Sequence, residues 1–263
     1  MKQPKWILIM FALMLIIMSA GCGGGEEGAP VTGGKGDGGA QEAASPVDPA
    51  TAATITGTVN FTGTAPEPEP ILMDAEPVCM DKHGNGVFSE AVVVNSNNTL
   101  KNVFVYVKEG LPADMEFPTP QEAVLLDQEG CVYVPHVFGM MVGQDLVIKN
   151  SDGILHNINP MPSVNRPYNV GQPVEMETTK TFDKAEMYIP IECDVHDWMS
   201  AYVNVLEHPY YSTTGDDGTF SLPNLPPGTY TIIAWHETYG EQTMEVTVGD
   251  KETKDVSFEF AAN

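Results

Sequence analysis

The feature that most restricts the fold of this chain is a series of short segments in which apolar and polar residues alternate. Thr54–Phe61, Met244–Val248 and Val256–Phe260 alternate with a period of two, as strands with one buried face do. Turn residues separate such segments, for example at Gly215–Gly218 and Pro226–Gly228. No sustained helical periodicity follows the first 21 residues. The pattern therefore predicts an all-β fold built from sandwiches.

The N-terminus has the layout of a secretory signal. A positively charged start precedes the apolar run Trp6–Met18, and small residues lead to Cys22. The run is short for a transmembrane helix, and small residues before a cysteine resemble a bacterial lipobox. We expect residues 1–21 to be the signal peptide and Cys22 to carry lipid; ordinary secretion with a free Cys22 is the alternative. Residues 22–51 have almost no apolar content, which predicts a flexible tether from a membrane to an extracytoplasmic domain.

The charge balance limits the possible partners. Asp and Glu number 36 against 12 Lys and Arg, a net charge of −24. Nucleic acid is excluded, because binding phosphates requires the opposite sign. The acidity indicates either a positively charged protein partner or simple solubility. No activated nucleophile or paired-carboxylate signature is present, so we expect no enzymatic activity.

A cluster of soft metal-ligand residues lies between two predicted strands. Cys193, His196 and Met199 occupy one short loop between Met187–Ile191 and Ala201–Val205. Two nitrogens, a thiolate and a weak axial methionine form a blue-copper site. His156 is the candidate for the second nitrogen, and the set leaves no open position for a substrate. The alternative interpretation is a buried thiol, a core methionine and a surface histidine.

Cysteine parity bears on the same loop. With Cys22 acylated, Cys79, Cys131 and Cys193 remain, so one thiol stays outside any intramolecular disulfide. A lone thiol in an oxidising compartment suits a metal ligand, which assigns that role to Cys193. Cys79 and Cys131 then form a disulfide. Alternatively, these two cysteines hold a second metal together with His83 or His136, although their spacing fits no zinc pattern.

Residues 131–206 resemble the cupredoxins, the family of plastocyanin and amicyanin. The resemblance is carried by Gly143–Asn150, by His156-Asn157, and by the spacing of Cys193, His196 and Met199, which is similar to that of amicyanin. It implies one copper ion cycling between Cu(I) and Cu(II). His156, Cys193 and His196 are the implied strong ligands, and Met199 is the implied axial ligand.

The same resemblance implies a role as an electron carrier. Asn157 is expected to orient the cysteine loop by lying near Cys193 or Asp194. Electrons are expected to pass through an exposed edge of His196. The implied partner is a redox protein such as a c-type cytochrome, with a basic docking face. Two other classes remain open: a copper storage or delivery protein, and a binding or adhesion module with a structural copper.

Residues 208–263 resemble the carboxypeptidase regulatory-like, or prealbumin-like, sandwich. Thr214–Phe220 and Leu225–Tyr230 carry the resemblance, and that family often opens with a strand like Ile55–Val59. We therefore predict a cupredoxin Greek-key domain over residues 91–207, inserted into this smaller sandwich. Residues 52–90 form an N-terminal strand and loop segment that either stands alone or completes the C-terminal sandwich. The stretch Val92–Gly110 fits either domain.

Overall fold

The chain is folded almost entirely into β-strands over the residues that this computed structural model describes, 46–84 and 86–262. The strands are β1 (Ala53–Thr62), β2 (Phe104–Glu109), β3 (Val124–Glu129), β4 (Val132–Val134), β5 (Val137–Met141), β6 (Leu146–Asn150), β7 (His156–Pro160), β8 (Val170–Gln172), β9 (Met176–Lys180), β10 (Glu186–Glu192), β11 (Ser200–Leu206), β12 (Tyr211–Thr213), β13 (Thr219–Leu225), β14 (Gly228–His236), β15 (Gly240–Val248) and β16 (Thr253–Ala261). One short helix, α1 (Pro77–Lys82), interrupts the series. The predicted all-β class is confirmed.

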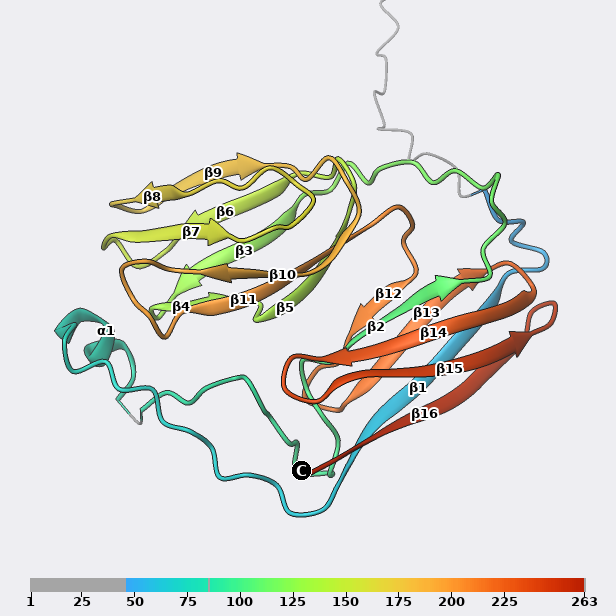
Figure 1. Ribbon diagram of the computed structural model, residues 1–263, viewed down its shortest axis with the longest axis horizontal. Helices are drawn as coiled ribbons and strands as arrows, with labels where there is room; N and C mark the ends of the chain where they lie inside the picture. Colours follow the sequence, from blue (N-terminus) through green and yellow to red (C-terminus); the bar gives the residue numbers. More distant parts are fainter. Residues whose placement is uncertain (1–45, 85, 263) are drawn as a thin grey trace, which may run out of the picture. The chain divides into compact units, whose positions relative to one another are not determined.

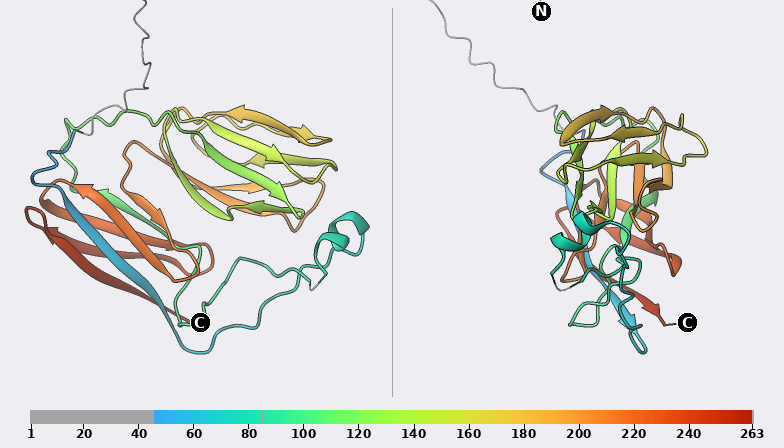
Figure 2. Two further views of the ribbon diagram at one scale, coloured as in Figure 1. Left: turned by 180° about the vertical axis from the view of Figure 1, so that it is seen from behind. Right: turned by 90° about the vertical axis from the view of Figure 1, so that its left-hand side faces the viewer.

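Two sheets with the orders β13-β1-β16 and β12-β2-β14-β15 form one sandwich, called here the outer sandwich. Its N-terminal strand β1 pairs antiparallel with β13 and parallel with β16, so residues far apart in sequence lie side by side. Figure 1 shows this blue strand beside the orange and red strands, and Figure 2 shows the same arrangement from behind. Every second residue of β1 is buried against the apolar core, as its period-two pattern predicts.

Strand β2 corrects the expected domain boundary. Phe104–Glu109 pairs with β12 and β14, and therefore belongs to the outer sandwich rather than to a domain that begins at residue 91. Its residues Phe104–Val107 are buried, because β2 is an inner strand of its sheet. Upstream of β2, Val94 forms an isolated bridge with Leu100.

A second sandwich, called here the inserted sandwich, runs from β3 to β11. Its sheets have the orders β5-β11-β10-β7-β8 and β4-β3-β6-β9. Their apolar residues enclose a core of their own, which includes Leu126, Ile148 and Val203. Because β2 precedes this sandwich and β12 follows it, the chain leaves the outer sandwich, builds the inserted one and returns.

Aromatic side chains join the two sandwiches. The ring of Tyr188 in β10 stacks on Trp235 of β14, with 4.4 Å between ring centroids and 12° between planes. Phe104, Val137 and Leu206 are buried in the same apolar cluster. The two sandwiches are therefore joined by a packed apolar cluster as well as by the chain that runs between them.

The segment around α1 is attached to the inserted sandwich by a disulfide between Cys79 and Cys131. The helix starts at Pro77, a favoured first position, and its six residues are too few to produce a helical periodicity in the sequence. None of the helices in the described part of the chain is long and apolar enough to span a bilayer. The predicted signal, the lipidation of Cys22 and most of the tether lie outside the described residues.

Candidate metal centre

The loop with the three soft ligands is held at both ends by paired strands. In β10 and β11, Ile191 lies opposite Ala201 and Glu192 opposite Ser200, so the loop from 193 to 199 closes a hairpin. Within it, Cys193 N donates to Met199 O at 3.3 Å, and Met199 N donates to His196 O at 3.0 Å. The sulfur-bearing side chains of Cys193 and Met199 are buried in the same apolar cluster.

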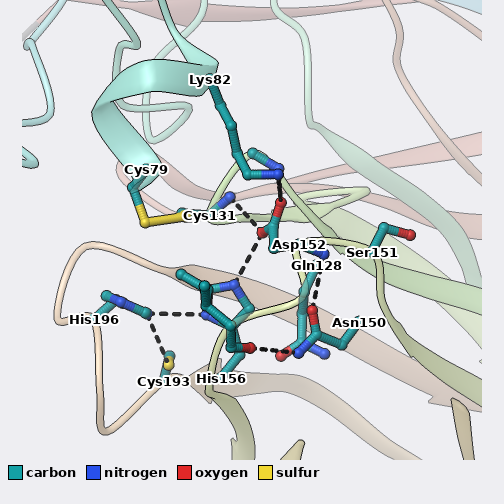
Figure 3. Close-up of polar contacts among 12 residues, drawn as sticks. Cys79, Lys82, Gln128, Cys131, Asn150, Ser151, Asp152, His156, Cys193 and His196 are labelled. Carbon is teal, nitrogen blue, oxygen red and sulfur yellow. Dashed lines mark hydrogen bonds and ion pairs between the residues drawn. A yellow bond between two sulfur atoms is a disulfide. The ribbon is translucent and has the colours of Figure 1, made fainter. Parts of the chain in front are cut away.

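His156 reaches the same place from another strand. Strand β7 pairs with β10 on the side away from β11, which puts the start of β7 beside the ligand loop. His156 Nδ1 lies 2.9 Å from His196 Nδ1, and Cys193 Sγ lies 3.9 Å from that same His196 atom. Figure 3 shows the three side chains converging. His156 is 0% exposed, and His196 and Cys193 are each 3% exposed.

The spacing of these donors suits a single ion. The ligand atoms of His156, Cys193 and His196 all lie within 4.8 Å of one another. Metal–donor bonds of about 2.0–2.3 Å put two donors of one ion no more than about 4.6 Å apart, and the separations of 2.9 Å between the two Nδ1 atoms and 3.9 Å between His196 Nδ1 and Cys193 Sγ are below that limit. His156 comes from strand β7, whereas Cys193 and His196 come from the loop between β10 and β11, and the three side chains meet at one buried point. Such a group of soft and borderline donors fits copper.

Asn157 lies beside Cys193 and Asp194, as expected, and stabilises the loop that carries them. Its Oδ1 accepts a hydrogen bond from Asp194 N at 2.7 Å and lies 3.3 Å from Cys193 Sγ. Its Nδ2 donates to Asp194 Oδ2 at 3.1 Å. The Asp194 carboxylate also accepts hydrogen bonds from Asn169 and Asn159, which lower its pKa. The loop therefore keeps its shape through contacts with a neighbouring strand.

Asp152 is a site residue to which the sequence analysis gave no role. Its Oδ2 accepts hydrogen bonds from His156 Nε2 at 2.9 Å and Cys131 N at 2.7 Å. Its Oδ1 accepts from Gly130 N at 2.7 Å and from Lys82 Nζ at 2.9 Å. Figure 3 shows the carboxylate between α1 and the imidazole. With its Nε2 proton directed to Asp152, His156 has a free lone pair on Nδ1, the atom that faces the other donors.

The electrostatics favour the ligand form of the thiol. Burial acts to raise the pKa of Cys193, but the hydrogen bond with His156 and those with the backbone of the ligand loop and Asn157 together outweigh it and lower that pKa. Burial likewise opposes ionisation of Asp152, yet His156 and Lys82 hold its pKa well below the usual range. The thiolate is the form of cysteine that ligates metals.

The alternative of a second metal site at the other cysteines is wrong. Cys131, Asp152 and His156 are close enough to share an ion, but the Cys131 sulfur is bonded to Cys79 and offers no thiolate. His83 Nε2 is hydrogen-bonded to Gly130 O. His136 is bonded to Ser200 O and to the Glu237 carboxylate. Both histidines therefore have structural partners.

The expectation of an exposed edge on His196 is also wrong. The residue is buried, and the Trp198 ring lies against it with 5.0 Å between ring centroids. Trp198 is itself fixed, because its Nε1 donates to Cys131 O at 3.0 Å. The Trp198 ring therefore shields the His196 ring on one side.

Comparison with known proteins bears on both sandwiches. The family model of the carboxypeptidase regulatory-like domain matches residues 199–261, which cover β12–β16 together with β11 of the inserted sandwich. No curated protein matches the chain. A Cu-containing nitrite reductase from Thermus scotoductus SA-01 is 17% identical, with 38% of this chain and 26% of that one covered and a TM-score of 0.31. The chain thus spans about a quarter of the reductase.

Two smaller proteins are similar over almost their whole length. A purple cupredoxin from Nitrosopumilus maritimus is 17% identical, with 31% of this chain and 98% of that one covered and a TM-score of 0.27. A mutant of amicyanin in its Cu(I) form is 17% identical, with 38% and 97% covered and a TM-score of 0.29.

Proposed function

We propose that the inserted sandwich binds one copper ion through His156, Cys193, His196 and Met199 and that the protein carries single electrons outside the cytoplasm. The observation that carries the proposal is the buried meeting of two imidazole Nδ1 atoms and one thiol within 4.8 Å. Two histidines, a cysteine and a long axial methionine are the ligands of blue-copper sites. A copper ion bound there supplies a one-electron couple between Cu(I) and Cu(II).

The role of the protein is to hold one geometry for both oxidation states. Asp152 fixes the ring of His156, and Asn157 fixes the loop that carries Cys193. Strand pairing on both sides of the loop adds rigidity. Such preorganisation limits the rearrangement that accompanies electron transfer, because the ligands cannot relax to a different geometry in either state.

The proposal favours a carrier over an enzyme or a copper store. The four donors complete the ligand set, whereas catalytic metals keep a position open. The donors are also buried to 97% or more, which opposes the ready exchange expected of a delivery protein. The outer sandwich, matching a carboxypeptidase regulatory-like domain, is proposed as an accessory module.

The proposed location rests on the N-terminal sequence. A lipidated Cys22 would hold the folded part near a membrane, and stable anchoring takes more than one acyl chain. Mass spectrometry of the mature N-terminus tests this, since the diagnostic product begins at Cys22 and carries acyl mass. Cleavage elsewhere, or an unmodified Cys22, contradicts the anchor without affecting the copper site.

Protein-film voltammetry of the copper-loaded protein tests the carrier function. We expect a reversible one-electron couple and one copper per chain by metal analysis. His196→Ala removes a ligand, so copper affinity and electron exchange rate should both fall. An irreversible or absent couple contradicts the carrier, and copper that leaves readily to a chelator would support storage or delivery instead.

A further inference from the structure

The burial of His196 leaves the proposed carrier without the expected exit for its electron. Trp198 is only half-buried, and its ring is the neighbour of the His196 ring. An electron that leaves through His196 therefore passes to Trp198 and reaches the surface at the exposed part of that side chain. The surroundings of Trp198 decide what can dock there.

Trp198 lines a pocket with a volume of about 380 Å³. One wall consists of the two ends of the segment that carries α1: Ile71 N donates to Val87 O at 2.9 Å, and Ser89 N donates to Glu69 O at 2.8 Å. The opposite wall comes from β4 and from the end of the ligand loop. The inserted segment and the metal centre thus build the pocket together.

The pocket combines exposed apolar side chains with negative charge. Leu72 is 73% exposed and Phe88 is 50% exposed, and both line the pocket together with Trp198. Glu69, Glu90 and Asp197 add carboxylates, and no lysine or arginine among the described residues lines the pocket. Of the acidic groups, Glu90 has a cationic neighbour, Lys101 Nζ, at 3.6 Å.

We infer that this pocket, rather than an edge of His196, is the site where a positively charged redox protein docks and exchanges an electron through Trp198. Aromatic side chains such as those of Phe88 and Trp198 are enriched at protein interfaces, and the rim around an interface is polar. Carboxylates at the rim steer a cationic partner toward the pocket. Each encounter transfers one electron from the reduced protein to the oxidised partner, and no bond forms or breaks.

Tyr133 gives the pocket a second connection to the metal centre. This buried residue of β4 lines the pocket, and its hydroxyl donates to Asn157 O, next to the cysteine loop. The pocket is therefore one residue away from His196 through Trp198 and two residues away from Cys193 through Tyr133 and Asn157. This inference rests on the proposed copper function.

The test measures the second-order rate of electron transfer from the reduced, copper-loaded protein to a lysine-rich ferric c-type cytochrome by stopped flow. Two pocket variants are used, Phe88→Ser and Glu69→Lys. Their controls are Val174→Ser, at a side chain that is 56% exposed, and Asp183→Lys, with the same change of charge. Val174 and Asp183 flank β9, which lies at the opposite edge of its sheet from β4 of the pocket.

We expect each pocket variant to lower the rate about tenfold at low ionic strength, because contact area or steering is lost. The controls should stay within about twofold. Added salt should remove the difference for Glu69→Lys and leave it for Phe88→Ser. The visible band and the reduction potential should be unchanged in all four variants, since none of these residues is a ligand.

Two kinds of failure can be told apart. A wild-type protein with a reversible couple but equal rates in pocket and control variants overturns the docking site alone. A wild-type protein without a couple overturns the copper function and the docking site together. If the pocket variants react more slowly with the small cationic complex tris(phenanthroline)cobalt(III) but not with the cytochrome, the pocket receives a small cationic oxidant, and the protein partner is overturned.

Discussion

Two fully buried histidines, one in each sandwich, show how differently the two domains use their interiors. His156 of the inserted sandwich and His236 of the outer sandwich are both 0% exposed. His156 contacts the Asp152 carboxylate and the other proposed ligands. His236 instead lies against the rings of Tyr239 and Phe260, and its Nε2 has no hydrogen-bond partner.

The electrostatic consequences are opposite. Burial lowers the pKa of His236 to about 4, so this ring is neutral in the folded protein. For His156, burial also acts to lower the pKa, but the hydrogen bonds and charge attraction from Asp152 and Cys193 together outweigh it and raise the pKa. Burial alone therefore does not mark a functional histidine. The marker is a set of polar partners that satisfies one ring nitrogen and leaves the other directed at further donors.

The same contrast extends to the surroundings. Near His156, the inserted sandwich buries Asn150, Gln172 and Gln128 completely, and these amides bond to one another and to backbone carbonyls. The core of the outer sandwich is built from apolar side chains such as Ile55, Val59 and Leu222. Buried polar networks are costly unless they are satisfied. Their concentration at one end of one sandwich is consistent with a site there.

The largest expected effect comes from the disulfide, which only the inserted sandwich has. Cys79 and Cys131 are 52 residues apart in sequence. Replacing both with serine should lower the free energy of unfolding by about 4 kcal/mol on the chain-entropy treatment. Urea unfolding of the metal-free protein measures this change in the free energy of unfolding. Thiol counting on the unfolded wild type should find Cys79 and Cys131 unreactive. An equal loss of stability in the outer sandwich would show that the two domains unfold as one unit.

The second effect belongs to the outer sandwich and depends on pH. The unfolded chain protonates His236 near its ordinary pKa of 6.5, whereas the folded protein does so only near 4. Above pH 6.5 the ring is neutral in both the folded and the unfolded state. As the pH falls from 6.5 toward 4, only the unfolded chain takes up the proton, so the free energy of unfolding decreases by about 3 kcal/mol. His236→Phe should remove that part of the pH dependence while preserving the ring contacts. Unfolding free energies of both proteins at pH 7 and pH 4 give the comparison, and an unchanged slope would contradict it.

Asp152→Asn should weaken copper binding without changing the ligand set. The amide has the shape of the carboxylate but not the charge that faces Lys82 and orients His156. Loss of such an outer partner typically lowers metal affinity about 10–100-fold. The matched control is Asp127→Asn, since Asp127 is also a buried carboxylate paired with a lysine, Lys149 at 3.1 Å. Chelator competition should separate the two variants, and equal affinities would reduce Asp152 to a structural role.

The smallest effect concerns the axial ligand. Met199→Leu keeps the volume and burial of a side chain that is 1% exposed, so stability and the blue colour should be retained. The reduction potential should rise, because losing a thioether donor destabilises Cu(II) more than Cu(I). Voltammetry measures the shift. A potential identical to that of the wild type would show that Met199 is not a ligand.

Much of this picture could be predicted from short-range patterns, and the misses have a common physical cause. The alternation of Thr54–Phe61 correctly predicted strand β1, and the spacing of Cys193, His196 and Met199 predicted a loop in which the structure brings the first two beside His156. Period two reveals which face of a strand is buried, but not which strand lies beside it. For that reason the stretch Val92–Gly110 fitted either domain, and the boundary predicted at residue 91 put β2 in the wrong one.

The burial of His196 and the role of Asp152 were missed for a related reason. The role of Asp152 depends on a contact with Lys82 of α1, across 70 positions of the chain. The burial of His196 involves Trp198, which is fixed by a hydrogen bond to Cys131 O. An acidic residue four positions before a proposed histidine ligand was the available signal. In an extended loop that spacing does not by itself bring the two side chains together.

The most direct test of the central claim is the visible absorption spectrum of the protein loaded with Cu(II). One equivalent should produce an intense blue thiolate-to-copper charge-transfer band, because Cys193 is the only cysteine outside a disulfide among the described residues. Cys193→Ser should abolish the band, while His236→Phe should leave it intact. A colourless wild-type complex, or a band that survives Cys193→Ser, would contradict the account.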